Sequence, residues 1–283
     1  MAEVTMMGVK GGPAIKPGSN MPTSLLLRMS GKTILIDAGL GAASAICRAG
    51  VALTDIDAIY ITHMHSDHYL ELGPFFHTAW TAGLNRPIPV IGPSGLPAYW
   101  DHFLKSMAFD IALRIADEGR PALADLFEFT SISEGMLVAP DGIGVTALLN
   151  DHPPIKESFA LRFEGEDKSF VFSGDTARIA QMPLFAKDAD LLVHEAMMVD
   201  GVNRLVAKLP NIGNLLRTHI LRSHTPAHEV GEIAAEAGVQ HLALTHLVPD
   251  GDPLIGDADW ITEVRRAFHG PLTIGKDGII INL

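Results

Sequence analysis

A histidine-rich segment that directly follows an apolar run is the strongest constraint on this chain. Residues 56–61 predict a buried strand, and residues 63–68 then read His-Met-His-Ser-Asp-His. A buried strand that ends in a polar loop delivers side chains to a sheet edge, where sites in layered α/β folds form. Imidazoles and a carboxylate at this density suit zinc or a similar divalent ion. The alternative is a solvated polar loop, but such a cluster directly after a strand favours a metal.

The cysteine content limits which ligands a metal could have. Cys47 is the only cysteine among 283 residues, which excludes intrachain disulfides and any cysteine-built zinc or iron–sulfur site. The chain has 13 histidines. A metal here must therefore be bound by nitrogen and oxygen.

Three further ligand candidates each come one to three residues past a predicted strand. They are His152 after residues 144–149, Asp175 after residues 169–172, and His246 after residues 241–244. Taken singly, each is more often a capping or surface residue. Because the same placement recurs at four strand ends, we interpret these residues as parts of one site.

Short β-rich runs alternate with helical patterns along the whole chain, which predicts an α/β fold. We expect strands over residues 24–29, 33–36, 58–62, 88–91, 144–149, 159–163, 169–172, 190–193, 241–244 and 278–282. We expect helices over residues 42–49, 70–82, 97–107, 177–185, 226–237 and 257–268. No linker or repeat divides the sequence, so we expect a single domain over residues 1–283, with a helical insertion at about 96–126.

The helix expected over residues 226–237 has the clearest boundaries. Thr225 can cap it, Pro226 suits its first turn, and Gly238 suits a left-handed stop. The aromatic residues of the insertion at 96–126 are interpreted as core or homodimer contacts, with a lid over a pocket as the alternative.

At these residues the sequence resembles the metallo-β-lactamase fold superfamily of dinuclear metallohydrolases, and within it the branch of ribonuclease Z and the related arylsulfatases and phosphodiesterases. The motif at residues 63–68 carries the wider resemblance. His194-Glu195-Ala196, Ser223-His224-Thr225 and Leu244-Thr245-His246 carry the narrower one, which extends from about Gly8 to His246. The resemblance implies a four-layer αβ/βα sandwich of two mixed sheets with outer helices.

The resemblance also implies a site with two divalent metal ions, Zn²⁺ first, with Mn²⁺ or Fe²⁺ as alternatives. It assigns His63, His65 and His152 to one metal, Asp67, His68 and His246 to the other, and Asp175 to both. A hydroxide between the metals would then be the nucleophile. Asp67 would orient it, and His224, held by Glu195, would stabilise the developing charge or protonate the leaving group. A purely structural His224–Glu195 pair is the alternative.

The net charge of the chain and the length of one loop are the basis of the expected substrate. The chain has 21 Lys and Arg against 33 Asp and Glu, a net charge of −12, which disfavours a nucleic-acid coat. Ribonuclease Z usually carries a long basic arm, whereas residues 159–172 here form a short predicted hairpin. We therefore expect a hydrolase of a small anionic ester, a phosphodiester or sulfate ester first, with tRNA unfavoured. The alternatives are a tRNA 3′-processing endoribonuclease, a lactonase or carboxylic-ester hydrolase, and a metal-binding protein without catalysis.

One local stretch runs against the acidic composition. Residues 201–223 contain no acid, and we predict that one or more of Arg217, His219 and Arg222 bind the substrate anion. A solvated helical face is the alternative. No apolar run approaches the ~20 residues that span a membrane. No signal-peptide pattern occurs in residues 1–7, so a cytoplasmic protein without a membrane partner is expected.

Overall fold

Two seven-stranded sheets form the centre of the protein in a computed structural model that describes residues 2–209 and 211–283. The first sheet has the order β14-β1-β2-β3-β4-β5-β6, with β14 Ile279–Asn282, β1 Glu3–Gly8, β2 Ser24–Met29, β3 Lys32–Ile36, β4 Ala58–Tyr60, β5 Ile88–Gly92 and β6 Phe127–Ser131. The second has the order β13-β12-β11-β10-β9-β8-β7, with β13 Leu272–Ile274, β12 Leu242–Val248, β11 Leu191–Met197, β10 Lys168–Phe172, β9 Phe159–Gly165, β8 Gly144–Leu149 and β7 Gly135–Met136. Both sheets contain parallel and antiparallel pairs, as predicted.

The central strands are apolar on both faces because each sheet is covered on both sides. In β2, Leu25 and Leu27 point into the core between the two sheets, whereas Leu26 points to the helices outside. Phe163 and Phe170 of the second sheet meet the first sheet in the same central core. This double coverage explains why β2 reads as a continuous apolar run rather than an alternating one.

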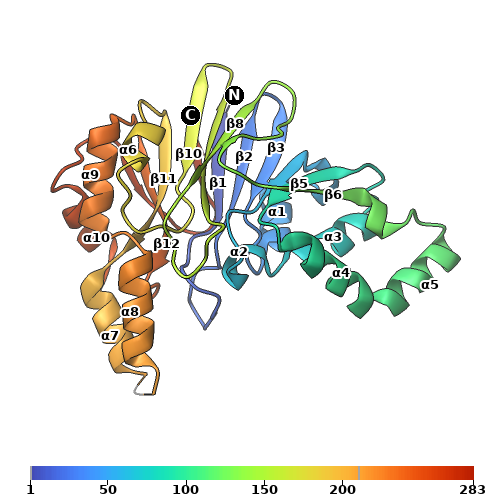
Figure 1. Cartoon of the computed structure of the whole chain (residues 1–283), viewed down its shortest axis with the longest axis horizontal. Coiled ribbons are helices and arrows are strands. Elements are labelled where there is room, and N and C mark those ends of the chain that lie inside the picture. Colours follow the sequence, from blue (N-terminus) through green and yellow to red (C-terminus); the bar gives the residue numbers. More distant parts are fainter. Residues whose placement is uncertain (1, 210) are drawn as a thin grey trace.

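Helices cover the outer face of each sheet, which confirms the four-layer αβ/βα sandwich (Figure 1). The first sheet is covered by α1 Ala42–Arg48, α3 Leu72–Thr81 and α4 Leu96–Ser106. The second is covered by α6 Met182–Phe185, α9 Ala227–Ala237 and α10 Asp257–Val264. No helix among the described residues is long and apolar enough to cross a membrane.

The helix α9 begins and ends close to the predicted boundaries, but its cap differs. Gly238 has a φ of 67°, the left-handed stop that the sequence predicts. Thr225 does not cap the helix: Pro226 is the N-cap residue, and no side chain bonds there. The Thr225 hydroxyl instead donates to the carbonyl of Thr176, because the chain enters α9 from the sheet edge.

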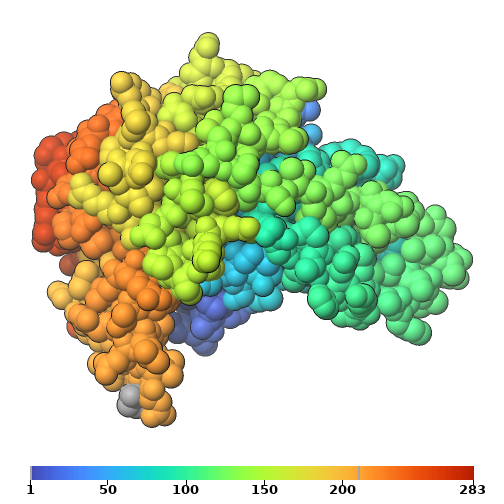
Figure 2. Space-filling view, viewed as in Figure 1, coloured from blue at the N-terminus to red at the C-terminus, as the bar shows by residue number. Residues whose placement is uncertain are grey.

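Two helical segments project from the layers (Figure 2). One holds α4 and α5 Ala108–Glu118, followed by the short helix η2 Leu123–Leu126, within residues 96–126. The other consists of α7 Val199–Ala207 and α8 Gly213–Ser223, the α7–α8 hairpin. The sequence predicts no helix boundaries here and gives a solvated helical face only as an alternative. Phe109 on α5 is 85% exposed. The single-domain organisation and a homodimer contact remain predictions.

Replacement of a central core side chain tests the two-sheet packing. Phe170→Ala is expected to lower the free energy of unfolding by about 3–5 kcal/mol, because it leaves a cavity between the sheets. Phe109→Ala is the matched control and should change that free energy by less than about 0.5 kcal/mol. Urea denaturation followed by circular dichroism measures both. Equal losses in the two variants would contradict the assigned core.

Candidate metal centre

The carboxyl ends of several strands from both sheets meet at one edge of the sandwich. In the first sheet, β3 and β4 are parallel, so Asp37 and His63 follow strands that end on the same side. In the second sheet, β10 runs parallel to β11 and β12, and two antiparallel steps give β8 the same direction. His152 and Asp175 follow β8 and β10 at that edge. The short helix α2 Ser66–Tyr69 carries Asp67 and His68 into the same space.

His246 reaches this edge by a different route from the one expected. The sequence places it after a strand that ends at Leu244, but β12 continues to Val248. The pairing with β11 slips at this point, since Glu195 lies opposite Thr245 and Ala196 lies opposite Leu247. His246 is therefore the extra residue of a β-bulge, with a φ of 42°. A bulge re-aims a side chain, and this one turns the imidazole toward the cluster.

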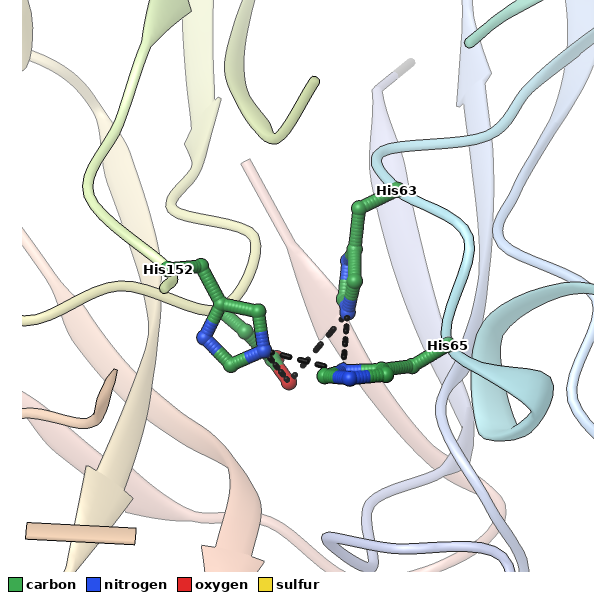
Figure 3. Close-up of side chains that lie close together, drawn as sticks. His63, His65 and His152 are labelled. Atoms are coloured by element: carbon green, nitrogen blue, oxygen red, sulfur yellow. Dashed lines mark hydrogen bonds and ion pairs between the residues drawn. The ribbon is translucent and has the colours of Figure 1, made fainter. Parts of the chain in front are cut away.

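Three histidines and one aspartate form the first group of possible metal ligands. The Nδ1 atom of His65 lies 3.1 Å from Nε2 of His63 and 2.9 Å from Nε2 of His152. The Oδ2 atom of Asp175 lies 3.7 Å from Nε2 of His63 and 3.8 Å from Nε2 of His152. Figure 3 shows the three imidazoles pointing toward one another. These four side chains offer ligand atoms that all lie within 4.8 Å of one another.

Asp67, His68 and His246 form the second group. The Oδ2 atom of Asp67 lies 3.3 Å from Nε2 of His246 and 3.7 Å from Nε2 of His68. Asp175 is shared with this group as well, because its Oδ2 atom lies 3.3 Å from Nε2 of His68 and 3.0 Å from Nε2 of His246. The structure thus brings together all seven ligand residues that the sequence predicts.

The polar atoms in this cluster fit bound cations. Within the described chain, Nε2 of His68 and Oδ1 of Asp175 are buried and have no hydrogen-bond partner. Leaving such groups unpaired costs free energy, which a divalent ion between them removes. Nitrogen and carboxylate oxygen are also donors that zinc, manganese and iron accept. The residues present therefore fit divalent metal ions.

Surrounding groups fix the orientation of several imidazoles. Nδ1 of His152 donates to the carbonyl oxygen of Ser223 over 2.9 Å. Because a carbonyl can only accept, the proton is on Nδ1, and the lone pair of Nε2 faces the cluster. His63 is held in the same way by the Thr62 hydroxyl, 3.1 Å from Nδ1. The backbone N–H of Gly12 donates to Oδ2 of Asp67 over 2.8 Å.

Asp37 is another group that orients a candidate ligand, and the sequence patterns above do not single it out; these orienting groups form the supporting layer of the site. Its fully buried carboxylate lies 2.7 Å from Nδ1 of His68 and accepts hydrogen bonds from the backbone and hydroxyl of Thr62. It therefore links the ligand His68 to the start of the loop at residues 63–68. The signal was present in the sequence, since Asp37 directly follows a predicted strand, as the other candidates do.

The electrostatics of the cluster leave most of its groups in the forms that bind metal. Burial lowers the pKa of His63 well below its usual value and the pKa of His152 to about 3, so both rings are neutral near pH 7. Burial opposes ionisation of Asp175, but His246 and His68 hold the pKa of its carboxyl well below the usual range.

His68 differs from the other histidines in its protonation. Burial opposes the charged ring, yet the carboxylates of Asp175 and Asp37 raise its pKa well above the usual value. The negative charge of these carboxylates thus favours a cation beside His68. A divalent ion among the carboxylates would take the place of the proton.

His224 and Glu195 form a buried pair beside the cluster, as predicted. Nδ1 of His224 lies 3.3 Å from Oε1 of Glu195, which also accepts the backbone N–H groups of Thr176 and Thr225. Burial opposes protonation of His224, but the Glu195 carboxylate raises its pKa above the usual value. The imidazole stacks on that of His246, with ring centres 5.2 Å apart. The Glu195 carboxylate thus favours the protonated form of His224 beside the candidate metal centre.

The cluster opens into a cavity of about 610 Å³. Of the three residues predicted to bind the substrate anion, His219 lines this cavity, with its ring centre 5.9 Å from that of His65. Arg217 and Arg222 are exposed and lie outside the cavity lining. The Nε atom of Arg217 donates instead to Asn203 of α7.

Several known proteins are similar to this chain. The ribonuclease Z of Mycolicibacterium gilvum (strain PYR-GCK) is 31% identical over 280 residues, which cover 98% of this chain and 94% of the relative. The ribonuclease Z of Mycobacterium bovis (strain BCG / Pasteur 1173P2) is 30% identical, with 98% and 96% covered. The metallo-β-lactamase fold protein YhfI from Bacillus subtilis gives a TM-score of 0.71 at 21% identity, covering 99% of this chain and 98% of that one. The short form of human tRNase Z gives 0.69 at 18% identity, with 99% and 98% covered.

The fold, the ligand cluster and these relatives together define a metal-dependent hydrolase of the metallo-β-lactamase fold that acts on ester bonds. A family model described as "Anti-Pycsar protein Apyc1" matches residues 2–243, and the chain belongs to that family. The predicted superfamily and the resemblance to ribonuclease Z are confirmed, whereas the arylsulfatase resemblance remains a prediction.

The expected partner, a small anionic ester with tRNA unfavoured, is wrong. Relatives that match 98% of this chain are ribonucleases Z. The short hairpin at residues 159–172 does not distinguish the chain from them: an alignment of 280 residues that takes up 94% of the relative leaves no room for a long arm missing here. Net charge is a sum over the whole surface and does not describe the surroundings of the site.

Removal of the Asp37 carboxylate tests the supporting layer. Asp37→Ala is expected to weaken zinc binding about 10–100-fold, because His68 loses the group that orients it. Asp57→Ala is the matched control, since Asp57 also accepts a backbone N–H at β3 but lies at the other end of that strand. Competition with a chelator, on protein shown by thermal unfolding to be folded, measures the affinity. Unchanged zinc affinity in Asp37→Ala would contradict this role.

Proposed function

We propose that the chain is a ribonuclease Z-type endonuclease that cleaves a phosphodiester bond at the 3′ side of precursor tRNA. One observation carries this proposal: Oδ2 of Asp175 lies 3.0–3.8 Å from Nε2 of four histidines, an arrangement suited to two metals that share one carboxylate. The identity to ribonucleases Z over nearly the whole chain supports RNA as the substrate.

The two ligand groups suggest how the metals would be held. His63, His65 and His152 would hold one ion, Asp67, His68 and His246 the other, and Asp175 both. Zn²⁺ fits these nitrogen and oxygen ligands best, and Mn²⁺ or Fe²⁺ would also fit. Bound divalent ions would supply Lewis-acid activation of water and of the phosphoryl group.

Asp67 places a negative charge next to the two ligand groups, where bound metal ions would activate water. Asp67 is held by the N–H of Gly12 and by its neighbours His68 and His246, which keep the pKa of its carboxyl well below the usual range although burial opposes ionisation. Its carboxylate is therefore an acceptor that can orient a water proton.

His224 is assigned as the general acid. Glu195 holds one nitrogen of its ring and favours the protonated form, and the other nitrogen is free to face the cavity that His224 lines. When the bond between phosphorus and the leaving oxygen breaks, that imidazolium gives its proton to the oxygen. Glu195 itself is fully buried and acts as a positioning residue.

The metal content tests the ligand assignment. Purified and zinc-loaded protein is expected to hold about two equivalents per chain. Asp175→Ala should hold clearly less, because both ligand groups lose the carboxylate they share. Asp141→Ala, at an exposed position away from the site, should keep the wild-type content. Elemental analysis by mass spectrometry gives the ratio. Wild-type content in Asp175→Ala would contradict the shared carboxylate.

Cleavage of a precursor tRNA with a 3′ trailer tests the proposed function. Wild-type protein should cut it, lose the activity on chelation, and act more slowly as salt rises because phosphate contacts are screened. His224→Ala should lower kcat by about 10²–10⁴-fold at unchanged metal content. Gel analysis of the RNA measures these rates. A metal-loaded protein that hydrolyses bis(p-nitrophenyl) phosphate but leaves precursor tRNA intact would overturn the assigned substrate.

A further inference from the structure

One side of the cavity is apolar although the candidate metal centre beside it is polar. Leu205 of α7, Leu209 just beyond the end of that helix, and Leu216 and Ile220 of α8 line it. Leu216 and Ile220 lie four residues apart on one face of α8, so this helix turns an apolar face to the cavity. The leucines remain partly exposed there. Packing of α7 against α8 therefore leaves part of the surface of these leucines exposed.

His219 stands between this apolar wall and the metal ligands. Its ring centre lies 6.2 Å from that of His152 and 6.5 Å from that of His224. The ring is partly exposed to the cavity, and no side-chain hydrogen bond to it is found in the described part of the chain. An imidazole in this position offers a flat surface to a ligand next to the candidate metal centre.

Two lysines and three aspartates also line the cavity. Lys10 and Lys16, from the loop that follows β1, both line it. The Lys10 ammonium group is held by the carbonyls of Gly11 and Gly12, and Lys16 is exposed. A ligand in the cavity thus meets charged side chains and the candidate metal ligands as well as an apolar wall with an aromatic ring beside it.

We propose that the apolar side of the cavity is a nucleobase subsite. The base of the nucleotide next to the cleaved phosphate packs against Leu216, Ile220 and His219, while its phosphate lies toward the metal ligands and the lysines. Bases stack on imidazoles and apolar side chains irrespective of sequence. A phosphate or sulfate ion alone would make no favourable contact with these apolar side chains. The cavity of about 610 Å³ is large enough for a nucleotide. The inference rests on the proposed function, and its test does not depend on RNA cleavage.

Two ligands that differ only in the base test this subsite. Adenosine 5′-monophosphate and ribose 5-phosphate are titrated into zinc-loaded protein by calorimetry. Wild-type protein is expected to bind the nucleotide about tenfold more tightly. Leu216→Ala should weaken nucleotide binding about three- to tenfold and leave ribose 5-phosphate binding unchanged, because only the base meets this side chain.

The neighbouring residue gives a matched control. Leu215 lies on the same helix, is 80% exposed and is outside the cavity lining, so Leu215→Ala should leave both affinities unchanged. Circular dichroism and thermal unfolding show whether the variants keep the fold. His219→Ala should weaken nucleotide binding selectively, as Leu216→Ala does.

The outcomes separate this subsite from the proposed function. Equal affinity for the two ligands, or the same effect of Leu215→Ala and Leu216→Ala, overturns the subsite. Precursor-tRNA cleavage is measured on the same preparations. Cleavage without base-dependent binding overturns the subsite alone. Base-dependent binding that Leu216→Ala removes, without tRNA cleavage, supports the subsite and overturns the proposed function.

Discussion

The buried carboxylate of Asp175 is the group on which the rest of the site depends. An ionised carboxylate away from water costs several kcal/mol unless cations or hydrogen bonds offset it. His68, which follows β4 of the first sheet, and His246, on β12 of the second, hold this carboxyl in its ionised form. The two segments that carry them must therefore meet at the same edge. Strand ends on a packed sandwich are rigid, so the ligand atoms are held at their spacing before any ion arrives.

Sequence patterns predicted the parts of this arrangement that are local. The segment at residues 63–68 is a contiguous motif, and His152 and Asp175 follow strands that their apolar runs reveal. The bulge at His246 was not predicted, because it is a slip between two strands and neither strand shows it alone. Asp37 was missed because a single aspartate after a strand has many roles, and its partner His68 is distant in sequence. The α7–α8 hairpin was interpreted as a basic stretch that binds the substrate anion, with a solvated helical face as the alternative.

The substrate expectation failed for a related reason. Net charge is additive over the whole chain, whereas recognition depends on the few groups around one cavity. Lys10 and Lys16 line that cavity although the chain carries a charge of −12. Loop length was an equally indirect criterion, since relatives named ribonuclease Z align along nearly their whole length. The composition therefore pointed to the wrong partner, and its limit on the metal ligands remains a prediction.

The bond between His152 and Ser223 gives the α7–α8 hairpin a mechanical connection to the candidate metal centre. Ser223 is the last residue of α8; its carbonyl holds the His152 ring, and its hydroxyl donates to Pro153. Any displacement of α8 must carry a metal-facing imidazole with it or break a buried hydrogen bond. The position of the hairpin therefore bears on the bond that fixes the protonated nitrogen of His152. The position of α8 and the orientation of the His152 ring are therefore coupled through Ser223.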